Sequence, residues 1–337
     1  MISDQRVMDI VLRIANRDRG MRRGMKVERA RGYICMAAFR PKHELLVRQI
    51  RSIQTQEISE WRCVIGIDGA DADTRSAIEA VIGDDQRFVV REFPDNVGFY
   101  RNFERLLEEV PLDVGWVALA DQDDEWFPEK LTRSVQGLED AALVVGQVVV
   151  VGVDSAIGEI SARRAVPLIA EFIDNQVTGS AAVFRRSLLD VALPFPDATD
   201  LAFHDHWLGV CALATGGIAV IDAPLQNYIQ HGGNVIGEEQ PSGIGARMRN
   251  LFRQAGSSPL DSLRYLRQHR WGWRVNMARR LLAVGPSLSH DDAPGVAAIA
   301  RGRLSPTLIA ATVSAVVRRE APPARTLGLL IGAATYR

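Results

Sequence analysis

Three carboxylates lie within four residues near the middle of the chain. The stretch Asp121 to Trp126 reads DQDDEW, and it follows the apolar run Gly115 to Ala120, which is typical of a short buried strand. Carboxylates held this close repel one another unless a cation neutralises them. Mg²⁺ typically binds one or two carboxylates together with phosphate oxygens of a substrate. The stretch therefore indicates either a metal site for a nucleotide diphosphate or a solvated acidic turn before a helix that begins near Pro128.

The elements around this stretch alternate between strand and helix. Predicted strands cover 33–39, 61–68, 87–92 and 115–120, and predicted helices cover 43–56, 74–82, 98–110 and 128–139. Such alternation predicts right-handed βαβ units and a mainly parallel sheet flanked by helices. Ligands of these sheets bind outside the carboxyl ends of the strands. Asp68 and Asp121 both follow strands, so we expect them at the same edge, which favours the metal site.

The second half of the chain is less regular. We predict a long strand at 142–154, a loop region at 155–178, a strand at 178–184, a helix at 204–215, two short strands at 218–222 and 225–230, and helices at 260–284, 306–320 and 324–334. The chain then divides into a basic amphipathic N-terminal helical extension (1–30), an α/β catalytic domain (31–237) and an Arg-rich C-terminal helical region (238–337).

The charge composition limits the kinds of partner that we expect for this chain. A net charge of −1 over 337 residues gives no general attraction to nucleic acid. Residues 1–31 hold nine Lys/Arg against four Asp/Glu, and residues 245–280 hold nine Arg against one acid. These basic ends indicate either an anionic surface such as phospholipid or solvated arginine-rich helices, and the N-terminal helix could also pack on a second subunit of an oligomer. No apolar run reaches the length of a membrane span, and the three unpaired cysteines are predicted core residues of a cytosolic protein.

Two common phosphate-binding motifs are missing from the sequence. No GxGxxG follows the first predicted strand and no GxxxxGK[ST] occurs, which disfavours a Rossmann dinucleotide site and a P-loop. A bound phosphate would then need a metal to neutralise it, because no glycine-rich loop is present to do so.

Seven motifs in order extend the argument from one stretch to about 200 residues. They are QIRSIQTQ (49–56), IDGADADT (67–74), NVGFYRNFERLL (96–107), ADQDDEWFPEKL (120–131), TGSAAVFRRSLLD (178–190), HDHWL (204–208) and YIQHGGNVIG (228–237). With them, the stretch from Tyr33 to Gly237 resembles family 2 glycosyltransferases, whose GT-A fold is that of nucleotide-diphospho-sugar transferases. The resemblance is greatest to the bacterial cell-surface rhamnosyltransferase-like group.

The resemblance implies a donor side for the site. Asp68 would contact the nucleotide base, Asp121 would lie at the ribose or at a uracil or thymine base, and Arg101 would reach the diphosphate. Ala38 stands on the first strand where the donor base is recognised. This chain departs from the family there, with Ala38-Phe39-Arg40 for a Thr-Tyr-Asn and Ile67-Asp68-Gly69-Ala70 for an Asp-Asp-Gly-Ser, which bears on the identity of the nucleotide.

The resemblance also implies the metal, the base and the acceptor side. Asp123 would ligate a divalent cation, Mg²⁺ or Mn²⁺, with Asp124 in support and His231 as a further ligand. Asp205 matches the general base. The residues that would border the acceptor are Gly179, Ser180 and Trp126.

Together these residues predict an inverting, metal-dependent glycosyltransferase. It would move a sugar, with rhamnose as the candidate, from a nucleotide-diphosphate donor to a hydroxyl of a glycan or lipid-linked saccharide in cell-surface polysaccharide synthesis. We expect it in the cytoplasm or peripherally on the inner face of the membrane. The alternatives are a nucleotidyltransferase with a related sheet, disfavoured because Arg40-Pro41-Lys42 lacks glycine, and a non-catalytic nucleotide-sugar binding module, disfavoured because Asp205 is present.

Overall fold

The computed structural model describes residues 31–152, 158–197, 202–230 and 259–336. Its strands are β1 (Gly32–Ala38), β2 (Trp61–Asp68), β3 (Phe88–Phe93), β4 (Trp116–Asp121), β5 (Glu125–Trp126), β6 (Leu143–Gly152), β7 (Glu159–Ile160), β8 (Ala182–Arg185) and β9 (Ile218–Gln230). Among the described residues up to 220, the helices are α2 (His43–Gln54), α3 (Ala72–Ile82), α4 (Gly98–Glu108), α5 (Lys130–Gly137), α6 (Leu168–Ile173), α7 (Leu189–Ala192) and α8 (His204–Thr215), with 3₁₀ turns η2 (Gly179–Ala181) and η3 (Arg186–Leu188).

The strands form one mixed sheet in the order β3-β2-β1-β4-β8-β6-β9-β5, with β7 paired to β6. Strands β3, β2, β1 and β4 are parallel neighbours, and β8 joins them antiparallel to β4. The register pairs Ala38 with Ile67 and Ala37 with Asp121, so the carboxyl ends of β1, β2 and β4 meet at one edge. The predicted α/β fold with flanking helices and a C-terminal helical region is confirmed, with antiparallel strands added to the parallel half.

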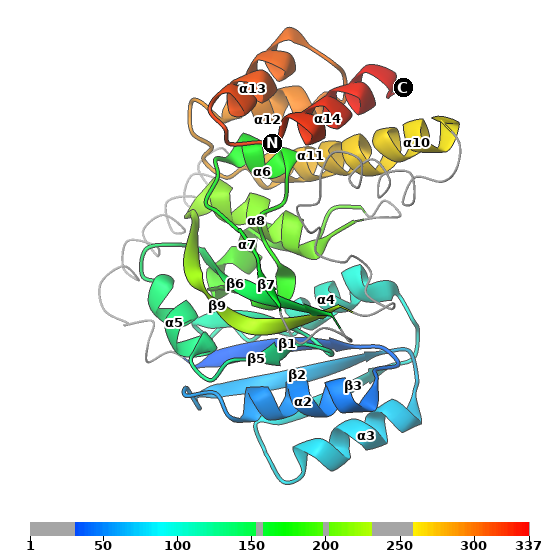
Figure 1. The fold of residues 1–337 in the computed structure, drawn as a ribbon, viewed down its shortest axis with the longest axis vertical. Coiled ribbons are helices and arrows are strands. Elements are labelled where there is room, and N and C mark those ends of the chain that lie inside the picture. The colour runs from blue at the N-terminus through cyan, green and yellow to red at the C-terminus, as the bar shows by residue number, and fades with distance from the viewer. Residues whose placement is uncertain (1–30, 153–157, 198–201, 231–258, 337) are drawn as a thin grey trace, which may run out of the picture.

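Side chains that alternate along the strands build a core on each side of the sheet. Ile34 and Met36 of β1 pack in one cluster with residues of α2, α3 and α5, whereas Tyr33 and Cys35 pack in the other with residues of α4 and α8. In Figure 1, α2 and α3 lie beyond one end of the sheet domain and the C-terminal helices lie at the opposite end of the molecule. The three cysteines are buried and unpaired, as predicted.

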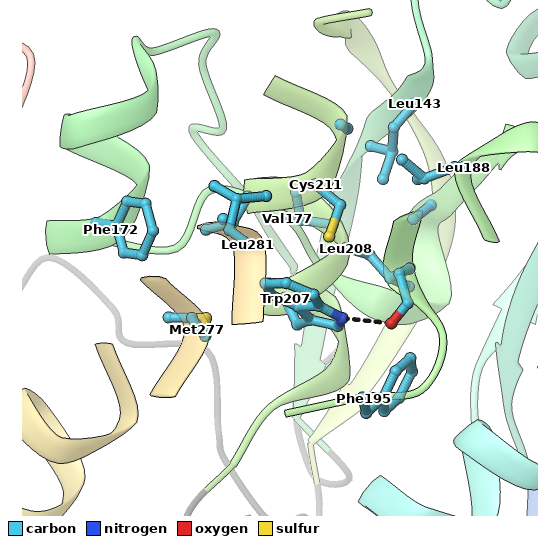
Figure 2. Close-up of a cluster of buried hydrophobic side chains, with 14 of the residues drawn as sticks. Leu143, Phe172, Val177, Leu188, Phe195, Trp207, Leu208, Cys211, Met277 and Leu281 are labelled. Atoms are coloured by element: carbon cyan, nitrogen blue, oxygen red, sulfur yellow. Dashed lines mark hydrogen bonds between the residues drawn. The ribbon is translucent and has the colours of Figure 1, made fainter. Parts of the chain in front are cut away.

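Helix α8 lies in the middle of the second cluster (Figure 2). Trp207 is fully buried and donates a hydrogen bond from Nε1 to the carbonyl of Ala192 at 2.8 Å. The same cluster includes Phe172 of α6 and Met277 of a C-terminal helix. The C-terminal helices are α10 (Pro259–Tyr265), the π-helix η4 (Leu266–Gly272), α11 (Trp273–Val284), α12 (Ala293–Ala300), α13 (Pro306–Val317) and α14 (Pro323–Thr335). They share one core with the sheet domain, so they can hold α8 in place.

The structure corrects three predictions of secondary structure. The loop predicted at 155–178 contains β7 and α6, a helix too short to show a period but buried through Leu168 and Phe172. The two strands predicted around Pro224 are one strand, β9, because a register shift against Gly146 and Gln147 accommodates the proline. The single helix predicted at 260–284 is interrupted by the π-helical turn η4, and α12 was not predicted. Across the described residues, none of the helices combines the length and apolar character needed to cross a membrane.

Candidate active site

Asp68 ends β2 and is almost fully buried, at 3% exposure. Its carboxylate accepts hydrogen bonds from the backbone N–H groups of Val97 and Gly98, both at 2.9 Å, and pairs with Arg105 Nη2 at 2.7 Å. Gly98 has φ 78°, a conformation that favours glycine and lets its N–H face the strand end. In this structure Asp68 therefore holds the turn that begins α4 against the edge of the sheet.

A cavity of about 580 Å³ opens at the carboxyl ends of β1 and β2. Its wall is rich in carboxylates and includes one exposed aromatic ring. The lining residues are Phe39, Arg40, Pro41, Asp68, Gly69, Ala70, Asp71, Asp73, Thr74 and Asn96. Phe39 is 46% exposed, and its backbone N–H and carbonyl bond the side chain of Gln122 at 2.7 and 3.1 Å. Gln122, which stands between Asp121 and Asp123, thus connects the cavity wall to the DQDD turn through these hydrogen bonds.

The carboxylates of the DQDD turn occupy different positions. Asp121 is the last residue of β4 and Asp123 is partly exposed, whereas Asp124 is fully buried. Asp124 accepts hydrogen bonds from Gln226 Nε2 at 2.9 Å and from the N–H of Ile229 at 3.4 Å. Ser180 Oγ also accepts from Gln226 Nε2, at 2.8 Å, which links η2 to the turn. We call Asp121, Asp123 and Asp124 the acidic cluster.

A buried lysine lies under the acidic cluster, and the sequence did not point to it. Lys130 has no exposed surface, and its ammonium donates to Gln226 Oε1 at 2.5 Å and to the carbonyl of Ser180. The ammonium also lies 3.8 Å from the centroid of the Trp126 ring. Burial depresses the pKa of Lys130 well below its usual value, and the charges of Asp124 and Asp121 act in the opposite direction. When it is protonated, Lys130 is an internal cation that attracts both carboxylates.

The electrostatics of the acidic cluster bring a distant residue into the same site. Burial raises the pKa of Asp121 well above its usual value, and the charges of Asp124, Asp123 and Asp205 raise it further. Burial and the neighbouring Asp123 raise the pKa of Asp124 to about 7. Asp205, about 80 residues later in the chain, is therefore close enough to Asp121 for the two carboxylates to repel each other.

These residues fit a hard divalent cation. The donors are carboxylate oxygens, and the mutual repulsion that raises their pKa values would be relieved by a positive charge. Asp124 is already bonded to Gln226 and Ile229, which suits a supporting residue more than a direct ligand. Within the part of the chain that the structure describes, no three His, Cys, Asp or Glu side chains form a complete metal cage. Mg²⁺ needs none, since one or two carboxylates and substrate phosphates suffice.

Asp205 occupies the first turn of α8, where the helix dipole favours a carboxylate. The N–H of His206 donates to its Oδ1 at 2.7 Å, and the N–H of Gly179 and the side chain of Asn175 also bond it. Burial raises the pKa of Asp205 to about 6, while these bonds and the charge of Arg163 hold it down. A carboxylate with this pKa is ionised near neutral pH and can accept a proton.

Of the other predicted residues, three lie beside α8 or Lys130 and one makes its contacts elsewhere. Gly179 packs directly on α8, and Ser180 and Trp126 surround Lys130. Arg101, however, forms an ion pair with Glu104 on its own helix and does not line the cavity at β1 and β2.

Two predicted residues remain. Ala38 is buried at the end of β1, next to the cavity residue Phe39. His231 lies outside the described residues.

The sequence missed the residues that support the carboxylates: Lys130, Gln226, Asn175 and Arg163. Lys130 lies within a quoted motif and could have been singled out as the only cation beside the acidic cluster. Gln226, Asn175 and Arg163 carry no local signal, because only the folded sheet and the path of residues 161–177 bring them to the site.

Comparison with solved structures shows the fold. TarS 1–349 of S. aureus in complex with UDP-GlcNAc is 13% identical over 87% of this chain and 93% of that chain, with a TM-score of 0.51. The same protein in complex with UDP is 12% identical over 86% and 91%, with a TM-score of 0.52. A mannosyltransferase of Pyrobaculum calidifontis, in complex with GDP-Man and Mn²⁺, gives 16% identity over 90% and 86%, and a TM-score of 0.46. No curated protein sequence matches the chain.

The fold and the acidic edge of its sheet define a glycosyltransferase of the GT-A class. Residues 33–190 match the family model described as Glycosyl transferase family 2. The match covers a little under half of the chain, and it confirms the predicted resemblance to this family over that segment.

Proposed function

We propose that the chain is an inverting, metal-dependent glycosyltransferase that moves a sugar from a nucleoside-diphosphate donor to a hydroxyl of a glycan or lipid-linked saccharide. One observation carries this proposal. Asp205, a partly buried carboxylate with a pKa of about 6, lies at the same edge of the sheet as the acidic cluster and repels Asp121. A candidate base and a candidate diphosphate site thus face the same space.

The donor would lie across the carboxyl ends of β1, β2 and β4. The cavity of about 580 Å³ has room for a nucleoside, and Phe39 offers an exposed ring for stacking on a base. The diphosphate would then extend towards Asp121 and Asp123. The TarS structures, which contain UDP-GlcNAc and UDP, support a nucleoside-diphosphate donor. Asp123 would hold Mg²⁺ or Mn²⁺, which would stabilise the charge that develops on the leaving diphosphate, and His231 stays a predicted ligand.

In the transfer step, the acceptor hydroxyl attacks the anomeric carbon of the donor sugar. Its proton goes to the carboxylate of Asp205, the new bond from carbon to oxygen forms, and the bond from the anomeric carbon to the diphosphate breaks. The nucleoside diphosphate leaves with the electron pair. A single displacement inverts the anomeric carbon and needs one catalytic carboxylate. Gly179 and Ser180, beside Asp205, would border the acceptor, while Trp126 and Lys130 would shape the site from beneath.

The two alternatives explain the site less well. A non-catalytic nucleotide-sugar binding module has no use for a partly buried carboxylate with a pKa of about 6 at the N-terminus of α8. A nucleotidyltransferase would leave Asp205 without a role, because its substrate is activated at the phosphate itself.

The test separates donor binding from transfer. We expect Asp205→Asn to bind the nucleotide sugar as the wild type does in a thermal-shift assay with Mn²⁺, and to lose transfer by at least about a hundredfold. Asp123→Ala should lose the stabilisation that depends on Mn²⁺. A screen of nucleotide sugars that includes a rhamnose donor would identify the sugar. Transfer by Asp205→Asn at the wild-type rate would remove Asp205 as the base.

We also propose that the enzyme acts in cell-surface polysaccharide synthesis at the cytoplasmic face of an anionic membrane. Helix α13 exposes Ile309, Val313 and Val317, which are 40%, 46% and 76% exposed and lie on one face at four-residue spacing. Residues 293–336 hold five arginines and one acid, so the segment that contains α13 carries a net positive charge. Two copies of such a surface would repel each other, whereas anionic lipid would bind it.

Co-sedimentation with vesicles tests this contact. We expect binding to vesicles that contain phosphatidylglycerol and little binding to phosphatidylcholine alone. The double variant Val313→Asp/Val317→Asp should lose binding while it keeps transfer to a soluble acceptor. Equal binding by this variant and the wild type would contradict the proposal, as would self-association through α13 without vesicle binding.

A further inference from the structure

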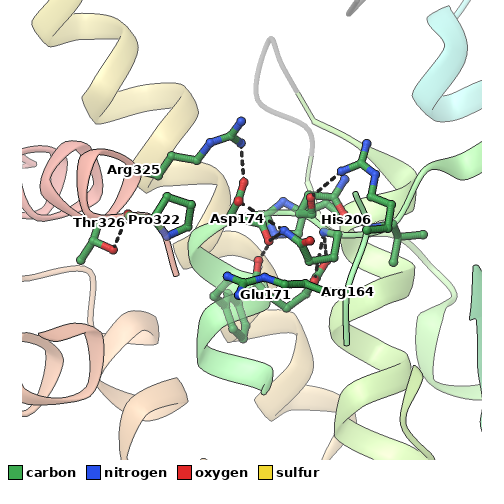
Figure 3. Close-up of polar contacts among 12 residues, drawn as sticks. Arg164, Glu171, Asp174, His206, Pro322, Arg325 and Thr326 are labelled. Carbon is green, nitrogen blue, oxygen red and sulfur yellow. Dashed lines mark hydrogen bonds and ion pairs between the residues drawn. The ribbon is translucent and has the colours of Figure 1, made fainter. Parts of the chain in front are cut away.

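The segment between β7 and η2, which carries Arg164, Glu171 and Asp174, lies between His206 of α8 and Arg325 of the C-terminal helices (Figure 3). Two of its residues, Arg163 and Asn175, act on the carboxylate of Asp205. Their immediate neighbours, Arg164 and Asp174, bond the C-terminal helices instead. The same backbone therefore contacts the candidate base on one side and α13 and α14 on the other.

On the side of the base, two residues act on Asp205 and also contact each other. The side chain of Asn175 hydrogen-bonds the Asp205 carboxylate, and the positive charge of Arg163 attracts it. The side chain of Asn175 is fixed by the N–H of Val177, which donates to its Oδ1 at 2.9 Å. The backbone carbonyl of Asn175 accepts a bond from Arg163 Nη1 at 3.1 Å. The two partners of Asp205 thus hold each other.

On the side of the helices, two arginines make the connection. Arg325 of α14 forms an ion pair with Asp174 in which the acid is only 12% exposed. Arg164 donates from Nη1 and Nη2 to the carbonyls of Arg319 and Glu320, at 2.6 and 2.9 Å. Arg319 has φ 61°, which ends α13 and turns these carbonyls outward. Arg164 therefore holds the turn that follows α13, while Arg325 joins α14 to Asp174.

The space between the two sides is packed with bonded polar groups. Glu171 is fully buried and accepts from the N–H of Gln176 with both oxygens, at 3.1 Å each. A ring nitrogen of His206, the residue after the candidate base, lies 2.8 Å from the carbonyl of Glu171. Arg274 of α11 donates from Nε to the carbonyl of Phe172 at 2.9 Å. A displacement of α14 would therefore be transmitted to the segment and to α8.

We propose that the C-terminal helices position the catalytic base, with Arg325 and Arg164 as positioning residues that act through Asp174, Asn175 and Arg163 on Asp205. This inference rests on the proposed function, because it takes Asp205 as the base. It gives the C-terminal helices a part in the transfer step that is separate from any contact with a membrane. It also explains why, in each of the pairs Arg163-Arg164 and Asp174-Asn175, one residue acts on the base and the other contacts the C-terminal helices.

The test compares Arg325→Met, which keeps the aliphatic stem and removes the charge, with Arg325→Lys, which restores a cation. We expect Arg325→Met to lower kcat at least about tenfold with the donor KM nearly unchanged, since misplacement by 1 Å can cost about a hundredfold. Arg325→Lys should recover most of the rate. Arg318→Met is the matched control, because Arg318 on α13 bonds Ser314 and lies near Glu320 but makes no recorded contact with the segment.

A pH profile of kcat gives a second readout that a general loss of stability would not move. The charged and titratable groups around Asp205 are Arg163, Asp121, His206 and Glu171. Asn175 and Arg163 lower its pKa, so a loosened segment should move the acid limb of the profile to higher pH. Arg164→Met should move the limb in the same direction, and thermal unfolding would show that each variant is folded.

The outcomes separate the two proposals. If Asp205→Asn is inactive while folded Arg325→Met and Arg164→Met keep the wild-type kcat and pH profile, the positioning role is wrong and the base stands. If Asp205→Asn transfers at the wild-type rate, the proposed function itself is wrong. A fall in kcat with Arg325→Met that Arg318→Met reproduces would also overturn the positioning role, because it would follow from any lost arginine of these helices.

Discussion

The substitution Gly179→Ala tests how closely the acceptor side of the site is built against the candidate base. A Cβ at position 179 would lie 2.7 Å from Nε2 of His204 and 3.4 Å from Cβ of Asp205. An ordinary contact begins at 3.4 Å, so the gap to the imidazole must open by about 0.7 Å. The backbone N–H that bonds Asp205 is kept, so the substitution tests space alone.

The imidazole of His204 has little freedom to move away. It is 7% exposed and stacks on Phe103 at a centroid distance of 4.1 Å. Its ring nitrogens have no hydrogen-bond partner among the described residues, and burial lowers its pKa to about 3, so the ring is neutral. The strain should therefore pass to the start of α8, which carries Asp205. Overpacking of this kind typically costs about 1–3 kcal/mol of stability.

We expect Gly179→Ala to lower kcat by roughly ten- to a hundredfold, because a displacement of this size at the base misaligns proton transfer. Donor KM should change little, since the cavity at β1 and β2 does not include residue 179. The assay is transfer with saturating acceptor, alongside thermal unfolding. Gly328→Ala in α14 is the control, because its Cβ would meet only Leu266, at 3.4 Å. Wild-type kcat and stability in Gly179→Ala would refute the reasoning.

Two further predictions follow from charge. The kcat of the wild type should fall as the pH drops through about 6, because Asp205 must be ionised to accept a proton and its pKa lies there; a kcat that stays constant from pH 7 to pH 5 would argue against this base. Lys130→Met should destabilise the fold by about 3–5 kcal/mol in urea unfolding, because it leaves the buried carboxylates of Asp124 and Asp121 without their internal cation. A loss below about 1 kcal/mol would show that the acidic cluster does not depend on Lys130.

The residues at the edge of the sheet could largely be predicted, because the end of each strand follows from a local pattern in the sequence. An apolar run followed by a carboxylate, as at Asp68 and Asp121, predicts a residue at the carboxyl edge once strands and helices alternate. The parallel register of β1, β2 and β4 confirms this placement. What a local pattern could not show is how each carboxylate is used. Asp68 is bonded to Val97, Gly98 and Arg105, and the role predicted for it at the base stays a prediction.

The irregular half of the chain could not be predicted in the same way. Helix α6 has six residues, too few for a period, and it forms because Leu168 and Phe172 are buried by tertiary packing. Strand β9 continues past Pro224 because β6 shifts its register there. Both elements supply parts of the site, since β9 carries Gln226 and the end of α6 leads to Asp174 and Asn175.

The sequence by itself determined the class of the protein, because motif residues at strand ends are set by short-range order along the chain. It indicated the acidic cluster, and the resemblance of its motifs to a known family implied Asp205 as the candidate base. Only the tertiary structure decided what surrounds these carboxylates. Lys130 lies beneath the acidic cluster. Asn175 hydrogen-bonds Asp205 and the charge of Arg163 attracts it. The adjacent residues Asp174 and Arg164 contact α14 and the turn after α13. Such contacts join residues far apart in sequence, and they exist only because the C-terminal helices and the sheet domain bury one shared core.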